Sequence, residues 1–164
     1  MHLPGPMVCV GLFFALPAAA QNATFASRSL TPETALVDAR AALEACRKQG
    51  FQGAVAVTDR AGITQVLLRD RFAGPHTVEV ATNKAWTAGS FRTTTTALAV
   101  ETQPGRPMSG LRALPRFMAA GGGMVIEGGG NIFGAIGVSG GPGGEADDSC
   151  AAAGIKAIAD AVEF

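Results

Sequence analysis

The sequence of 164 residues contains no tyrosine and one tryptophan, and only 16% of its residues are charged. Its 13 basic and 13 acidic side chains cancel to a formal charge of zero, and no block of one sign stands out. A protein held to nucleic acid by phosphate contacts needs a clustered basic face, so this class is excluded. An apolar fraction of 48% also excludes a disordered chain. Length and composition predict one compact domain.

Side chains that bind metals or act as nucleophiles are scarce too. Two histidines and three cysteines are present, and they lack the spacing of a zinc site. No C-x-x-C-H motif attaches a haem covalently, and no G-x-x-x-x-G-K-[ST] motif binds phosphate. Ser139 follows a predicted hairpin strand, whereas a nucleophile elbow needs a helix directly after the serine. We therefore predict no catalytic residue and favour a non-catalytic protein, although an enzymatic activity stays open.

The first twenty residues are read as a targeting signal. Residues 1–20 contain no Lys, Arg, Asp or Glu, and Met7 to Leu16 form an unbroken apolar run that small residues follow. This pattern resembles a secretory signal peptide, and the run is too short to span a bilayer of about 30 Å. We expect cleavage near Ala20, a flexible segment over 21–30, and a periplasmic or secreted protein without a stable membrane span. The alternative is an uncleaved anchor at a membrane surface.

Export changes the expectation for the cysteines. Removal of the signal peptide leaves Cys46 and Cys150, and an even count in an oxidising compartment permits one disulfide. Such a bridge would close a loop of about 100 residues, which the chain-entropy model values at roughly 4–5 kcal/mol. The alternative is that both are small buried apolar side chains.

The first helix is signalled by its own residues. Thr31 is an expected N-cap, Pro32 suits the first helical position, and Glu33 lies near the positive end of the helix dipole. Apolar residues then follow the helical period until Gly50 ends it.

The remaining pattern alternates hairpins with helices. Two pairs of β-rich runs are each joined by a short turn, and we predict short helical turns and a loop between the second helix and the second hairpin. Hairpins require antiparallel pairing, so a doubly wound parallel sheet is excluded. The expected elements are strands at 54–58 and 63–68, a helix from about His76 with a stripe of small residues, short turns over 93–115, strands at 124–126 and 132–138, and a last helix with Asp147 and Asp148 in its first turn.

Several motifs in this order are familiar. The strings VTDRAG, RDRFAGPHTVEVATNKAWTA, GGGMVIEGGGNIFGAIGVSGG and CAAAGI together resemble the GlcG/HbpS family, also known for the C-terminal domain of PduO-type proteins. The resemblance runs from about Thr31 to Phe164. It implies an α/β (α+β) sandwich around an antiparallel sheet of about five strands, assembly into homo-oligomers and, in some members, haem binding.

The resemblance directs attention to possible haem contacts. His76 is the expected metal ligand, because a helix N-terminus favours the neutral imidazole that binds iron. Methionines 108, 118 and 124 or a threonine are weaker candidates. We expect cations to meet the propionates, an aromatic ring to cover the porphyrin, and a glycine loop to complete the cleft. These cofactor-binding candidates are Arg69, Arg71, Lys84, Trp86 or Phe72, Gly121, Gly122 and Gly123.

Each candidate also has a purely structural explanation. His76 can be a cap or a surface residue, Arg69 and Arg71 can end a solvated strand, and the glycines can serve turn geometry. The first functional hypothesis is therefore an exported protein that binds haem or a related tetrapyrrole noncovalently. The second is an oligomeric accessory protein, without a cofactor, for a periplasmic dehydrogenase or sensor. An enzyme or carrier for a small organic acid ranks last.

Overall fold

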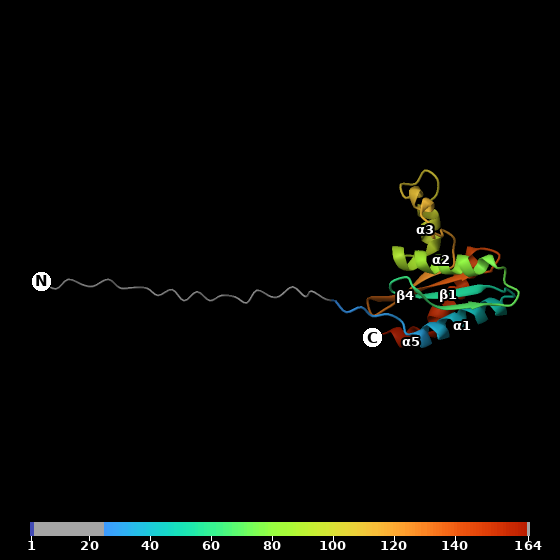
Figure 1. Ribbon diagram of the computed structural model, residues 1–164, viewed down its shortest axis with the longest axis horizontal. Coiled ribbons are helices and arrows are strands. Elements are labelled where there is room, and N and C mark those ends of the chain that lie inside the picture. Colours follow the sequence, from blue (N-terminus) through green and yellow to red (C-terminus); the bar gives the residue numbers. More distant parts are fainter. Residues whose placement is uncertain (2–24, 164) are drawn as a thin grey trace.

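One antiparallel sheet with helices on both faces forms the body of the protein (Figure 1). The computed structural model describes Met1 and residues 25–163, so the expected signal peptide after Met1 lies outside the described residues. The strand order is β2-β1-β4-β3. The elements in chain order are α1 (Pro32–Lys48), β1 (Ala54–Asp59), β2 (Thr64–Arg69), α2 (His76–Phe91), α3 (Thr95–Glu101), the 3-10 helix η1 (Ser109–Ala113), β3 (Gly123–Gly128), β4 (Asn131–Ser139), α4 (Gly144–Ala157) and α5 (Ala159–Val162).

The sheet of the described residues has four strands, so the expectation of about five was wrong in this detail. The segment before α1 does reach the sheet, since the Leu30 amide donates to the Phe133 carbonyl at 3.2 Å. The Ser29 hydroxyl donates to the same carbonyl. These contacts fix the segment without building a ladder, and no further strand results.

The predicted start of α1 is confirmed. The Thr31 hydroxyl accepts from the Thr34 amide at 3.3 Å, Pro32 opens the helix, and Glu33 lies in the first turn. In residues 25–163 no helix has the length and apolar character needed to cross a membrane.

Both predicted hairpins are present. In the first, the Asp59 carboxylate accepts from the Ala61 and Ile63 amides at 2.8 and 2.9 Å, and Gly62 has a φ of +79°. In the second, Gly129 and Gly130 both have positive φ, as a two-residue hairpin turn requires. Strands β1 and β4, which belong to different hairpins, then pair with each other and join the hairpins into one sheet.

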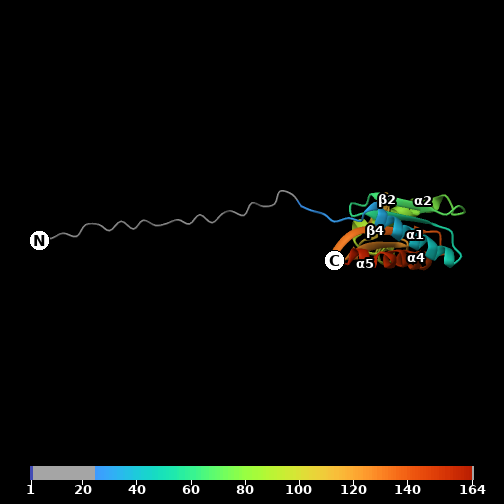
Figure 2. The ribbon, with the colours of Figure 1, turned by 90° about the horizontal axis from the view of Figure 1, so that it is seen from below.

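The two faces of the sheet are packed differently. On one face α1 and α4 lie side by side (Figure 2) and cover a core of branched side chains. On the other face α2 meets the sheet mainly through small residues: Ala54, Ala56, Ala81 and Ala85 form a buried cluster, with the partly buried Val78 packed against it. Gly137 lies directly under α2, where a Cβ atom would collide with the helix backbone. The predicted stripe of small residues therefore lets helix and sheet backbones approach closely.

The predicted cysteine pair is close in space. Cys46 on α1 and Cys150 on α4 are both buried, with sulfur atoms 2.10 Å apart and a sequence separation of 104 residues. This is disulfide distance, so the bridge joins the first long helix to the last.

A carboxylate is buried between the same two helices. Asp38 on α1 is fully buried, and neither of its oxygens has a hydrogen-bond partner. It lies against Gly154 of α4, where a Cβ atom would clash with it. Burial raises the pKa of Asp38 from 3.8 to about 8. The folded protein therefore holds this side chain as a neutral acid at pH 7.

Asp38 makes stability depend on pH. Between about pH 4 and pH 8 the unfolded chain loses this proton while the folded chain keeps it, so stability should fall with a slope of about 1.4 kcal/mol per pH unit. Asparagine does not titrate, so in Asp38→Asn this pH dependence of stability disappears. The variant should become progressively more stable than the wild type toward pH 8. Chemical denaturation at several pH values measures this. The exposed Asp160→Asn is the control, and parallel curves for all three proteins would contradict the prediction.

Loss of the bridge should be costly because it cross-links a long loop. Replacing Cys46 and Cys150 together by alanine should lower the free energy of unfolding by about 2–5 kcal/mol. Guanidinium denaturation measures the change. Reduced wild-type protein should unfold at the same midpoint as the double variant, and an unchanged midpoint in both would show that no bridge forms.

Candidate functional site

The predicted site residues lie at two opposite edges of the sheet. Arg69 ends β2 and Gly123 begins β3, and these are the two edge strands. Strands β1 and β4 lie between them, so at about 4.8 Å per strand the two backbones are about 14 Å apart. The candidates therefore form two groups instead of one cleft.

The first group is a corner formed by Arg69 and His76. The Arg69 guanidinium donates to the Ala73 carbonyl, which precedes Gly74. The imidazole of His76 covers Gly74 so closely that a Cβ atom there would lie 2.6 Å from the ring Cε1. His76 begins α2 and is exposed. The His76 imidazole and the Arg69 guanidinium thus both contact the loop at Ala73 and Gly74, and both residues are exposed to solvent.

Two apolar side chains that are close in sequence to this corner are exposed, Leu67 and Phe72. Leu67 points to the same sheet face as Arg69, because alternate residues of a strand share a face, and it is 42% exposed. Helix α2 packs over β1 and β4 far more than over β2, which leaves this part of the edge strand open. Phe72 is 79% exposed. We call this surface the α2–β2 face, and it comprises Leu67, Arg69, Arg71, Phe72, His76 and Trp86.

Trp86 lies at the far end of the α2–β2 face. Its indole is half-buried and meets Gly62, where a Cβ atom would be 3.2 Å from the ring. The Arg116 guanidinium lies 5.0 Å from the centre of the same ring. Arg71 in turn lies 5.9 Å from the Phe72 ring centre. Aromatic rings with cations nearby suit a flat ligand that carries carboxylates.

The second group surrounds Lys84, which is buried. Its Nζ donates to the Asp147 carboxylate at 2.7 Å and to the Val138 carbonyl at 2.9 Å. Both acceptors belong to the protein, whereas the sequence analysis expected Lys84 to bind a propionate of the ligand. The ion pair links α2, β4 and α4.

Two neighbouring aspartates fix the glycine loop beside Lys84. Asp147 accepts from the Gly141 amide at 2.8 Å, and Asp148 accepts from the Gly122 amide at 2.5 Å and the Thr96 hydroxyl at 2.5 Å. The sequence analysis placed both aspartates in the first turn of the last helix and missed this role. The sequence signal that could have indicated this role is the pair of consecutive acidic residues that follows a glycine-rich loop.

Gly121, Gly122 and Gly123 are all buried. A Cβ atom at Gly121 would lie 2.7 Å from the Thr96 hydroxyl, and one at Gly122 would lie 2.6 Å from Asp147. The three glycines therefore pack directly on the body of the protein, and their predicted role in lining a cleft stays a prediction.

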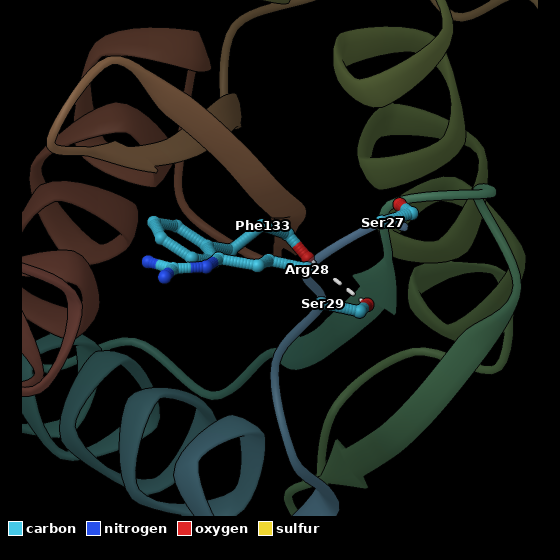
Figure 3. A pocket seen from close by; sticks show the side chains of 4 residues that line it. All are labelled: Ser27, Arg28, Ser29 and Phe133. Carbon is cyan, nitrogen blue, oxygen red and sulfur yellow. Dashed lines mark hydrogen bonds between the residues drawn. The ribbon is translucent and has the colours of Figure 1, made fainter. Parts of the chain in front are cut away.

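The larger cavities lie away from the α2–β2 face. One of about 490 Å³ is lined by Ser27, Arg28, Ser29 and Phe133 (Figure 3). It offers no imidazole or thioether. Another of about 460 Å³ is an apolar groove that contains Met108. In the described residues 25–163, no three His, Cys, Asp or Glu side chains come together as a metal site. The α2–β2 face offers the imidazole of His76, and the groove offers the thioether of Met108; both side chains are among those that hold haem iron in proteins.

An antiparallel sheet built from two hairpins, with helices on both faces, places the chain among α+β sandwich proteins. Residues 30–156 match the family model described as haem-degrading protein HbpS-like. The chain belongs to this family. Comparison with curated proteins gives no match.

Solved structures agree with this assignment. Protein ORFY from Klebsiella pneumoniae is 27% identical with a TM-score of 0.83, over 88% of this chain and 100% of that one. A double mutant of Streptomyces reticuli HbpS is 38% identical with a TM-score of 0.77, and the match covers 87% of this chain and 96% of that one. PduOC, solved as a complex with haem, is 31% identical with a TM-score of 0.75, and the match covers 79% of this chain and 95% of that one. The expected family and fold class are therefore confirmed.

The buried ion pair should be essential for stability. Replacing Lys84 by methionine leaves the Asp147 carboxylate buried without its counter-ion, which should cost about 3–5 kcal/mol of unfolding free energy. Adding Asp147→Asn removes the stranded charge and should recover part of the loss. Urea denaturation of the single and double variants measures this. A double variant no more stable than Lys84→Met would contradict the pairing.

Proposed function

We propose that the protein is an exported, non-catalytic binding protein that takes haem or a related tetrapyrrole noncovalently on the α2–β2 face. One observation carries the proposal: the exposed imidazole of His76 lies against Gly74, next to the Ala73 carbonyl that Arg69 binds. Leu67 and Phe72, a few residues away in the chain, are exposed apolar side chains. The PduOC relative, whose structure is a complex with haem, supports the choice of ligand.

Each side chain of the face has a distinct part in the proposal. His76 would supply one imidazole nitrogen to the iron. Arg69 and Arg71 would bind the propionates, since a guanidinium pairs with a carboxylate through two parallel hydrogen bonds. Leu67 and Trp86 would contact the ring. Bound haem would supply a metal coordination site and two carboxylates, while the protein would hold and orient it.

Export belongs to the same proposal. The apolar N-terminal stretch supports it, as does the Cys46–Cys150 pair at disulfide distance, because disulfides persist in oxidising compartments. The protein would then meet its ligand in the periplasm or outside the cell.

A haemin titration tests the ligand and the site together. Mature protein, residues 21–164, should give a shifted Soret band, and His76→Ala should weaken binding by about tenfold or more because the iron loses its strongest ligand. Arg69→Ala and Arg71→Ala should weaken it less. Arg40→Ala, an exposed arginine of α1 behind the sheet, is the matched control and should bind like the wild type.

Two further results decide the outcome. Trp86 is the only tryptophan, so its fluorescence reports binding independently of the Soret band. A wild-type protein that changes neither signal would overturn the proposal. Loss of binding in Met108→Ala, with normal binding in His76→Ala, would move the site to the apolar groove.

The cofactor-free accessory role stays a second prediction. The observation in its favour is the segment 92–116, which projects beyond α2 (Figure 1) and in which Val100, Met108 and Leu114 are exposed. The expected homo-oligomer also stays a prediction at this point.

A further inference from the structure

The loop between β2 and α2, residues 70–75, carries the corner at which Arg69 and His76 meet the backbone. The Arg69 guanidinium donates to the Ala73 carbonyl, and the His76 ring lies against Gly74. Both contacts are made with the backbone of this loop, so the place of the loop sets the place of both side chains. The anchors of the loop therefore set the geometry of the α2–β2 face.

One anchor comes from the opposite face of the sheet. Asp70 directly follows Arg69, the last residue of β2, and successive residues of an extended chain point to opposite faces. On the side of the sheet that α1 covers, Arg47 donates to Asp70 Oδ1 through Nε at 2.9 Å and through Nη2 at 2.5 Å. A salt bridge thus joins the last turn of α1 to the first residue of the loop.

The burial of Asp70 depends on this salt bridge. The Asp70 side chain is only 5% exposed, and its second oxygen, Oδ2, has no hydrogen-bond partner. Within residues 25–163, Arg47 is the one group that donates to this carboxylate. A buried carboxylate without a counter-ion is strongly unfavourable, so without Arg47 the ionised Asp70 would move out toward water and take the start of the loop with it.

Arg47 belongs to a helix end that is itself fixed. A basic side chain in the last turn of α1 is favoured by the helix dipole. The preceding residue, Cys46, is buried and lies at disulfide distance from Cys150 of α4. The loop is therefore anchored to the part of α1 that is held most firmly to the rest of the protein.

The same salt bridge has a consequence for the charge of the α2–β2 face. In sequence Asp70 lies between two exposed arginines, Arg69 and Arg71. Its ion-pair partner among residues 25–163 is Arg47, so it neutralises neither of them. Because Asp70 is held on the opposite face, both guanidinium groups keep their charge available for a carboxylate of the ligand.

We propose that Arg47 is a positioning residue for the α2–β2 face. By holding Asp70 on the opposite side of the sheet, Arg47 fixes the loop and with it His76, and it keeps the Asp70 carboxylate away from Arg69 and Arg71. Arg47 itself does not contact the ligand. What this says of ligand binding rests on the proposed function, whereas what it says of His76 does not.

The only histidine of the mature chain reports on the loop without any ligand. Residues 21–164 contain His76 and no other histidine, so its ring Cε1 proton gives a single signal in the proton NMR spectrum of haem-free protein. In Arg47→Ala this signal should shift, because the ring loses its contact with Gly74. With Asp70→Asn added, it should return toward the wild-type position, since a neutral amide can stay buried.

Two further variants complete the series. Lys48→Ala removes the neighbouring exposed cation of the same helical turn, and as the matched control it should leave the His76 signal unchanged. Arg47→Lys keeps the cation with a different donor geometry, so it should fold and give a smaller shift in the same direction as Arg47→Ala. This variant tests the proposal even where the stranded carboxylate of Arg47→Ala prevents folding.

Haemin titration of the same proteins measures the effect on binding. Arg47→Ala should bind haemin about tenfold more weakly than the wild type, and the double variant with Asp70→Asn should recover most of this loss. Urea denaturation gives the stability of each variant. An Arg47→Ala protein that is less stable, yet keeps the wild-type His76 signal and haemin affinity, would show a purely structural salt bridge and overturn the proposal.

The outcomes also separate this proposal from the one on haem. A wild type that does not bind haemin, with a His76 signal that shifts in Arg47→Ala and returns in the double variant, would overturn the haem proposal and support the positioning role. A double variant as disturbed as Arg47→Ala, or a Lys48→Ala control as disturbed as either, would overturn the positioning role.

Discussion

The ion pair between Lys84 and Asp147 holds the layers of this protein together. It is buried between a helix on one face of the sheet and a helix on the other, and the Lys84 ammonium also reaches a carbonyl of β4. A buried ion pair is stable only when its remaining donors and acceptors are hydrogen-bonded. Asp147 meets this need by also accepting from the Gly141 amide, and the neighbouring Asp148 accepts from the Gly122 amide, so the two aspartates fix the glycine loops at this end of the sheet.

A second constraint follows from the small residues under α2. Alanine and glycine bring the helix close to β1 and β4, and a helix so placed is too narrow to cover the whole sheet. Strand β2 is left partly open on this face, and Leu67 is exposed as a result. The open edge beside His76 thus follows from the position of α2 over β1 and β4.

Local signals in the sequence were sufficient for most of the fold. The Thr31 cap, the turn at Asp59 and the paired glycines at 129 and 130 act within a few residues, so the helix and both hairpins were predictable. The strand order was not, because it depends on β1 pairing with β4 across 77 residues. For that reason Arg69 and Gly123 were expected in one cleft. Burial of Lys84 was equally hidden, since its partner lies 63 residues away.

The link between Cys46 and Cys150 has a consequence for how the chain is made. The partner of Cys46 is 104 residues later, in the last long helix. During synthesis the Cys46 side chain therefore stays a free thiol until nearly the whole polypeptide has emerged. Every strand is then already outside the ribosome. Oxidation is therefore a finishing event: it can seal an assembled body, and it cannot guide the early stages of folding.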